Sequence, residues 1–110
     1  MASSKHLSSV AVDGQTITCP DMDSALRAII HRAKSGDGFT VFTLNLDHLV
    51  KLRRSADFRE AYANAGVITA DGAPVAWLAR LQNPSIQRTT GADLLVPLAE
   101  AAAEARLPVF

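Results

Sequence analysis

Hydrophobic and polar positions change their spacing several times along this chain, from strand-like alternation to helical repeats. Residues 10–18 place β-branched residues on both sides of Asp13-Gly14, which favours a hairpin of two short extended segments. Apolar residues then recur at near-helical spacing over residues 22–33, and Gly36 follows them. This region therefore predicts a hairpin followed by one amphipathic helix.

A second strand and two helices are predicted in the centre of the chain. Phe39 to Leu44 is a short run of β-forming residues that suits a buried parallel strand. Asn45 and Asp47 then open a helical stretch. A further helix is expected around residues 58–62, ending near Gly66.

The last third of the chain repeats this order. Val67 to Ala70 is the next predicted strand, and Pro74 suits the first turn of the helix behind it. A final helix is expected from Thr90 to about Arg106, with Pro97 kinking it or resetting its start. Residues 107–110 have the composition of the beginning of another strand.

Alternation of strands and helices predicts an α/β fold, a Rossmann-like, mostly parallel sheet with flanking helices. The polar residues 1–9 are expected to be a frayed N-terminus, which leaves residues 10–110 as the folded domain. In such sheets, ligands bind beyond the C-terminal ends of the strands. Polar clusters after residues 39–44 and 67–70 are therefore the first places to look for a site.

Composition excludes several function classes. Lys plus Arg and Asp plus Glu both number 11, so no net charge attracts nucleic acid. Cys19 is the only cysteine, which excludes an intrachain disulfide and suits a reducing cytoplasm. No apolar run approaches the roughly 18 residues of a membrane span. No glycine-rich nucleotide fingerprint is present, which disfavours a Rossmann oxidoreductase or an NTPase.

Asp71, directly after a predicted strand, has two interpretations. Asp71-Gly72 is an ordinary turn pair, in which Asp bonds to its own backbone and Gly supplies a positive φ. Its place after a strand also makes Asp71 a candidate catalytic carboxylate, although spacing alone favours the turn. Thr43 and Asn45 present a hydroxyl and an amide to a sugar at the neighbouring strand end, or Asn45 caps the following helix.

The segment from Arg88 to Asp93 is the third polar cluster. Thr90 and Asp93 have the spacing of a capping box, but the same helix start, with Gly91, presents N–H groups to a phosphate. Arg88 either adds contacts to a diphosphate or is an unpaired surface residue.

Metal ligation is not predicted. Asp21 and Asp23 match the Asp-X-Asp of metal-dependent sugar transferases, but their place at a helix start favours capping. His6, His31 and His48 have no common metal-ligand spacing and are expected to be surface or packing residues.

Four blocks together resemble one family. Residues 43–50 (TLNLDHLV), 57–62 (DFREAY), 69–79 (TADGAPVAWLA) and 88–95 (RTTGADLL) are similar, in order and spacing, to the WecG/TagA/CpsF glycosyltransferases, also called glycosyltransferase family 26. The resemblance covers the chain from about residue 8 to its end, and it corresponds to the N-terminal half of the family's domain. Ala73-Pro74 departs from many relatives, which carry a glycine or serine close by.

The resemblance implies an inverting transfer of an N-acetylmannosamine-type sugar from a UDP donor to a lipid-diphosphate-linked N-acetylglucosamine. Such products enter teichoic acid, enterobacterial common antigen or exopolysaccharide of bacteria. It implies that Asp71 is the general base, that Thr43 and Asn45 line the sugar site, and that Arg88 binds diphosphate. No metal or other cofactor is expected.

Relatives are about twice as long, so the resemblance also implies a truncated domain. A chain ending at Phe110 is expected to leave an incomplete sheet, low stability and little activity. The alternative function is an inactive remnant or a non-enzymatic α/β module that binds a partner. For the complete enzyme we expect a cytoplasmic location, peripheral membrane association through the missing residues, and homo-oligomers as one option.

Overall fold

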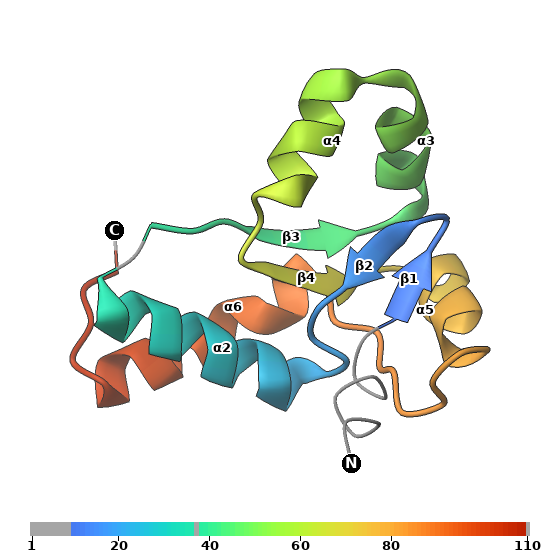
Figure 1. Cartoon of the computed structure of the whole chain (residues 1–110). Coiled ribbons are helices and arrows are strands. Elements are labelled where there is room, and N and C mark those ends of the chain that lie inside the picture. The colour runs from blue at the N-terminus through green and yellow to red at the C-terminus, as the bar shows by residue number, and fades with distance from the viewer. Residues whose placement is uncertain (1–9, 37, 110) are drawn as a thin grey trace, which may run out of the picture.

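The computed structural model describes residues 10–36 and 38–109, beginning with the predicted hairpin (Figure 1). Strands β1 (Val10–Val12) and β2 (Gln15–Ile17) pair antiparallel, with Val10 opposite Ile17. Asp13 and Gly14 form the turn with φ of 51° and 82°, the left-handed conformation that Asp tolerates and Gly adopts freely. The hairpin prediction is confirmed.

The second sheet is a parallel pair. Strands β3 (Val41–Leu44) and β4 (Val67–Ala70) run side by side, with Thr43 opposite Thr69. Two helices, α3 (Leu46–Arg54) and α4 (Ala56–Ala63), make the crossover between them, as Figure 1 shows. The hairpin adjoins β4 on its other side, because the amides of Thr18 and Cys19 both donate to the carbonyl of Ile68, at 3.0 and 3.1 Å.

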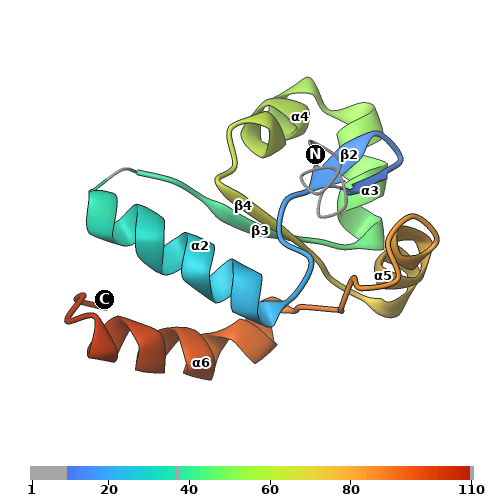
Figure 2. The ribbon, with the colours of Figure 1, turned by 60° about the horizontal axis from the view of Figure 1, so that its bottom comes forward.

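Helices cover both faces of the parallel pair. Helix α2 (Met22–Ser35) packs against α6 (Gly91–Glu104), and Figure 2 shows these two side by side along one face. Val67 of β4 packs in this layer with Leu94 of α6. Ile68, on the opposite side of β4, belongs to the core shared with the hairpin, α3, α4 and α5 (Ala73–Arg80). Strand alternation thus assigns odd-numbered β4 residues to the α2–α6 face.

Helix boundaries follow the capping chemistry that the sequence contains. Asp21 caps α2 in a capping box with Ser24, and Gly36 ends that helix at φ 78°. Pro74 lies in the first turn of α5. Thr90 caps α6. These predicted helix limits are confirmed.

The α/β class is confirmed, and one of the two sheets is parallel. The larger, mostly parallel Rossmann-like sheet is not found within residues 10–36 and 38–109, where each sheet has two strands. The prediction that β3 is a buried strand was wrong in part, because Leu44 is buried but Val41 to Thr43 are only half-buried. Within the described chain, β4 is the one strand that pairs with β3, so the other edge of β3 is left uncovered by a strand. The strand itself begins at Val41 rather than at Phe39.

One further prediction at the C-terminal end, a strand beginning at residue 107, needs correction. Residues 107–109 form no strand, because the amide of Leu107 closes the end of α6 on the carbonyl of Ala102 at 2.8 Å. Pro97 lies inside α6 without resetting its start, while Leu94 and Ala102 on either side are buried. The predicted frayed segment 1–9 and Phe110 lie outside the described residues.

Candidate functional site

The site predicted from the sequence is built at the edge where β3 and β4 end. The amide of Asp71 donates to the carbonyl of Leu44 at 2.8 Å, so the two chains stay paired one residue past the strands. Continuing the register places Asn45 opposite Asp71, as Thr43 is opposite Thr69. Three of these positions, Thr43, Asn45 and Asp71, were predicted site residues, and the fold brings them together.

A third segment joins this edge from the other side of β4. The amide of Thr89 donates to the carbonyl of Ala70 at 2.7 Å, and Thr69 Oγ1 donates to the carbonyl of Thr89 at 2.9 Å. Both Thr69 and Thr89 are buried. These bonds hold Arg88 and Thr90, the neighbours of Thr89, next to the strand end that carries Asp71.

Asp71 is half-buried, and its carboxylate forms no hydrogen bond or ion pair with any residue of 10–36 and 38–109. Gly72 has φ 85° and ψ 146°, a conformation open essentially to glycine, which turns the chain into α5. The positive φ of the turn interpretation is therefore confirmed. The hydrogen bond from turn backbone to the Asp71 side chain is absent, so the carboxylate is available for another partner.

Asn45 caps α3. Its Oδ1 accepts a 2.8 Å hydrogen bond from the amide of His48, which confirms the capping interpretation. The cap uses the oxygen and leaves the Nδ2 amide hydrogens as donors at the strand end. Thr43, two residues earlier in β3, is half-buried and carries a hydroxyl.

The segment 88–91 combines a capped helix start with an exposed cation. Thr90 Oγ1 accepts from the amide of Asp93 at 3.0 Å, so the forward half of the predicted capping box is formed. Gly91, the first residue of α6, is exposed, and a Cβ there would meet no atom within 4 Å. Arg88 is exposed and has no ion pair with the described residues. The space in front of this helix start is open.

A hydrogen bond between His48 and Tyr62 lies behind this edge, and no sequence signal indicated it. His48 Nδ1 and the Tyr62 hydroxyl are 2.7 Å apart, and Tyr62 is only 2% exposed. Burial, and secondly the negative charge of Asp71, raise the pKa of Tyr62 to about 12. The hydroxyl is therefore protonated at neutral pH and shares a hydrogen bond with His48 Nδ1, in which the His48 tautomer decides the donor. The packing role expected for His48 is confirmed.

The acidic pair at the start of α2 has a structural role. Asp21 Oδ1 accepts from the amide of Ser24 at 2.8 Å, and this bond is the main cause that lowers the Asp21 pKa. Asp23 is exposed in the first turn of the helix. Residues 10–36 and 38–109 bring no three potential metal ligands together. Metal independence of any activity stays a prediction.

Cys19 is buried, and burial raises the pKa of its thiol. It is packed with Ala25, Ile29 and other apolar residues between α2 and β4. A role in nucleophilic chemistry is therefore not indicated.

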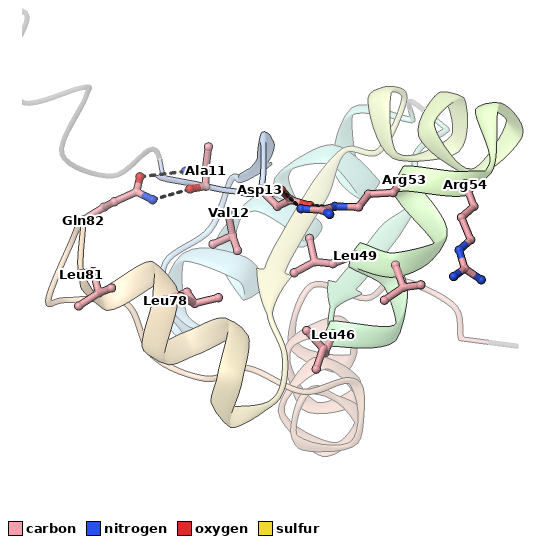
Figure 3. Close-up of a pocket in the computed structure, with 11 residues that line it drawn as sticks. Ala11, Val12, Asp13, Leu46, Leu49, Arg53, Arg54, Leu78, Leu81 and Gln82 are labelled. Atoms are coloured by element: carbon pink, nitrogen blue, oxygen red, sulfur yellow. Dashed lines mark hydrogen bonds and ion pairs between the residues drawn. The ribbon is translucent and has the colours of Figure 1, made fainter.

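An open groove of about 830 Å³ lies between α3 and α5, beside the strand-end site (Figure 3). Apolar side chains of both helices line it, together with residues of β1 and Arg53 and Arg54. None of the predicted site residues lines this groove. Its nearest connection to the site is Leu46, which follows Asn45 in the chain.

The fold is that of an α/β protein with polar residues at the C-terminal edge of a parallel strand pair, the edge at which proteins of this class bind ligands. Over residues 10–110 the sequence matches the family described as Glycosyl transferase WecG/TagA/CpsF family, and the chain belongs to that family. The resemblance noted from its four sequence blocks is confirmed. Comparisons with curated proteins and with solved structures gave no match.

Family membership assigns a glycosyltransferase-type function in polysaccharide biosynthesis, with sugar donor and acceptor as substrates. No helix among the described residues is long and apolar enough to cross a bilayer.

Proposed function

We propose that this protein contributes to transfer of an N-acetylmannosamine-type sugar from a UDP donor to a lipid-diphosphate-linked N-acetylglucosamine. The observation that carries the proposal is the half-buried, unpartnered carboxylate of Asp71 at a strand edge shared with Asn45 and segment 88–91. The family match supports glycosyl transfer in general. The particular sugar, the lipid acceptor and the cell-wall or exopolysaccharide product belong to the proposal.

Asp71 acts as the general base in this proposal. Its carboxylate accepts the proton of the acceptor hydroxyl while that oxygen bonds to the anomeric carbon of the donor sugar. The bond from this carbon to the diphosphate breaks in the same step, and UDP leaves with the electron pair. A single displacement of this kind inverts the anomeric configuration.

Arg88 and the start of α6 receive the diphosphate. Charge grows on the departing diphosphate, and the exposed guanidinium of Arg88 stabilises it through charge-assisted hydrogen bonds. The backbone amides of Gly91 and Gly72 lie at the starts of α6 and α5. The positive ends of these two helix dipoles add to the attraction for the diphosphate. Thr90 contributes its backbone here, since its hydroxyl caps α6.

Thr43 and Asn45 hold the sugar. The Thr43 hydroxyl donates and accepts, and the Asn45 Nδ2 group donates after its oxygen has been used for the cap. Neither residue adds charge next to Asp71. The reaction is proposed to need no metal or cofactor and to occur at the cytoplasmic face of the membrane.

A titration with UDP tests the nucleotide part of the proposal. We expect saturable heat with the wild-type protein and about tenfold weaker binding with Arg88→Gln, since a charge-assisted bond is lost. Arg27→Gln is the matched control, because Arg27 is an exposed arginine on α2, outside the edge. The alternative of an inactive remnant or partner-binding module predicts no UDP heat for any of these proteins.

A further inference from the structure

A hydrogen bond behind the strand-end edge joins the two helices of the crossover between β3 and β4. His48 Nδ1, in the first turn of α3, lies 2.7 Å from the hydroxyl of Tyr62, near the end of α4. Tyr62 is buried and His48 is half-buried. Because a buried hydroxyl is stable only with a hydrogen-bond partner, this bond ties the His48 ring to the core.

Aromatic rings pack around the bond and restrict both side chains. The Phe58 ring lies edge-on to the His48 ring, with 5.3 Å between centroids, and is also 5.3 Å from the ring of Tyr62. Phe42 of β3 lies 4.7 Å from the Tyr62 ring. Side chains enclosed in this way keep a single rotamer, so the bond has a defined direction.

The pair reaches Asn45 through the backbone of α3. The amide of His48 donates to Asn45 Oδ1 at 2.8 Å, so one residue holds Asn45 by its backbone and Tyr62 by its ring. The amide of Leu49 donates to the Asn45 carbonyl at 3.1 Å. Since Oδ1 is fixed by this cap, the direction of the Asn45 Nδ2 group depends on where His48 lies.

The pair is also coupled to Asp71. Burial is the main cause that raises the pKa of Tyr62, and the negative charge of Asp71 is the second. The two groups are therefore close enough to interact electrostatically. Tyr62 thus adds a neutral hydroxyl, and no second anion, to the surroundings of the proposed base.

We propose that His48 and Tyr62 are positioning residues of the transfer site, which fix the first turn of α3 so that Asn45 presents its Nδ2 group to the sugar. This inference rests on the proposed function. Without the bond, the His48 ring and the cap gain freedom, and the sugar spends less time in the reactive orientation. The rate of transfer then falls more than the affinity for UDP, which depends on Arg88 and the start of α6.

Transfer rates of three variants test the positioning role. Tyr62→Phe removes the hydroxyl and keeps the ring, and His48→Phe keeps a ring without nitrogen. We expect each to lower the rate about tenfold and to change UDP affinity less than about twofold. His48→Asn should retain most of the rate, because its side-chain amide again offers a polar atom to the Tyr62 hydroxyl.

Ile29→Val is the matched control for a small loss of stability. Ile29 is buried with Val67 in the layer between α2 and β4, apart from the core that contains Tyr62. Removing one methyl group there weakens the fold without changing the cap, so this variant should transfer like the wild type. Thermal unfolding of each variant shows that it is folded at the temperature of the assay.

The side-chain amide of Asn45 gives a second readout that needs no substrate. Its Nδ2 protons are observed by NMR in protein labelled with nitrogen-15, and their absence in Asn45→Ser assigns them. We expect Tyr62→Phe, which keeps the aromatic ring, to shift and broaden these signals because the cap becomes mobile. Ile29→Val should leave them unchanged.

Two results would overturn the proposal. The first is a Tyr62→Phe protein with the wild-type transfer rate or with unchanged Asn45 signals. The second is an equal loss of rate in His48→Asn and His48→Phe, which would show that the hydrogen bond is not what matters. A wild type that transfers no sugar counts against the proposed function instead, and the Asn45 signals then still decide whether the pair holds the cap.

Discussion

The amide of Thr89 donates a 2.7 Å hydrogen bond to the carbonyl oxygen of Ala70, the last residue of β4. Eighteen residues of chain, 71–88, lie between these two residues and include all of α5. Through it, Arg88 and the start of α6 are held against the strand end from which Asp71 projects. The proposed site therefore depends on one buried junction between β4 and the segment before α6.

Thr69→Val tests this junction. The substitution keeps the side-chain shape but removes the 2.9 Å bond from Thr69 Oγ1 to the buried carbonyl of Thr89. We expect a loss of about 1–3 kcal/mol in the free energy of unfolding, because a buried acceptor loses its donor. Thr16→Val, at an exposed strand position of β2, is the matched control in a urea titration. Equal effects of both substitutions would argue against a structural role of the bond.

Replacing Asp21 tests the capping role of the acidic pair before α2. Asp21→Ala should cost about 1 kcal/mol of stability, since the amide of Ser24 loses its acceptor. Asp23→Ala should cost a few tenths of a kcal/mol, because that exposed residue contributes only to the helix dipole. Chemical denaturation of both variants at neutral pH gives the comparison. A larger effect of Asp23→Ala would contradict the capping assignment.

The same cap predicts a dependence of stability on pH. The bond from Ser24 lowers the folded-state pKa of Asp21, so its contribution is present above the unfolded pKa of about 3.9 and is lost as pH falls through the folded value. Asp21→Asn keeps an acceptor oxygen but does not titrate. The stability of wild type minus that of Asp21→Asn should be constant near neutral pH and decrease below about pH 4. A difference that stays constant into acid would contradict the assigned cause.

Tyr62, the one tyrosine of the chain, provides a direct optical test of the pair behind the site. Its raised folded-state pKa, about 12, predicts that tyrosinate absorbance stays absent while pH rises through the ordinary value of about 10. The stability that this group contributes is complete below about pH 10 and is lost as pH rises through the folded value. A folded protein that ionises half of its tyrosine near pH 10 would contradict the burial of the Tyr62 hydroxyl.

Local chemistry made much of the fold predictable. Gly36 can end a helix because it adopts a positive φ, Pro74 suits a first helical turn, and Thr90 offers a capping oxygen. These effects act over a few residues, so the sequence carries them directly. The hairpin around Asp13-Gly14 was predictable for the same reason.

Features that depend on distant contacts were not predictable in this way. Three such contacts join segments that are far apart in the chain. They are the bond between Thr18 and Ile68 that attaches the hairpin, the bond between His48 and Tyr62, and the bond between Thr89 and Ala70. Residues 107–109 were mistaken for a strand because β-forming composition does not supply a pairing partner. The role proposed for Asp71 rests on the family resemblance rather than on residue spacing, and it stays a prediction.

The central claim is that the Asp71 carboxylate is the base for sugar transfer, and the transfer rate of Asp71→Asn tests it most directly. The protein is given a UDP-linked N-acetylmannosamine and a lipid-diphosphate-linked N-acetylglucosamine. Asp57→Asn, at an exposed aspartate in the first turn of α4 and outside the strand-end edge, serves as the matched control. We expect the Asp71→Asn rate to fall at least about 100-fold, with UDP affinity and stability preserved and the control fully active. Undiminished transfer by a folded Asp71→Asn protein would contradict the account.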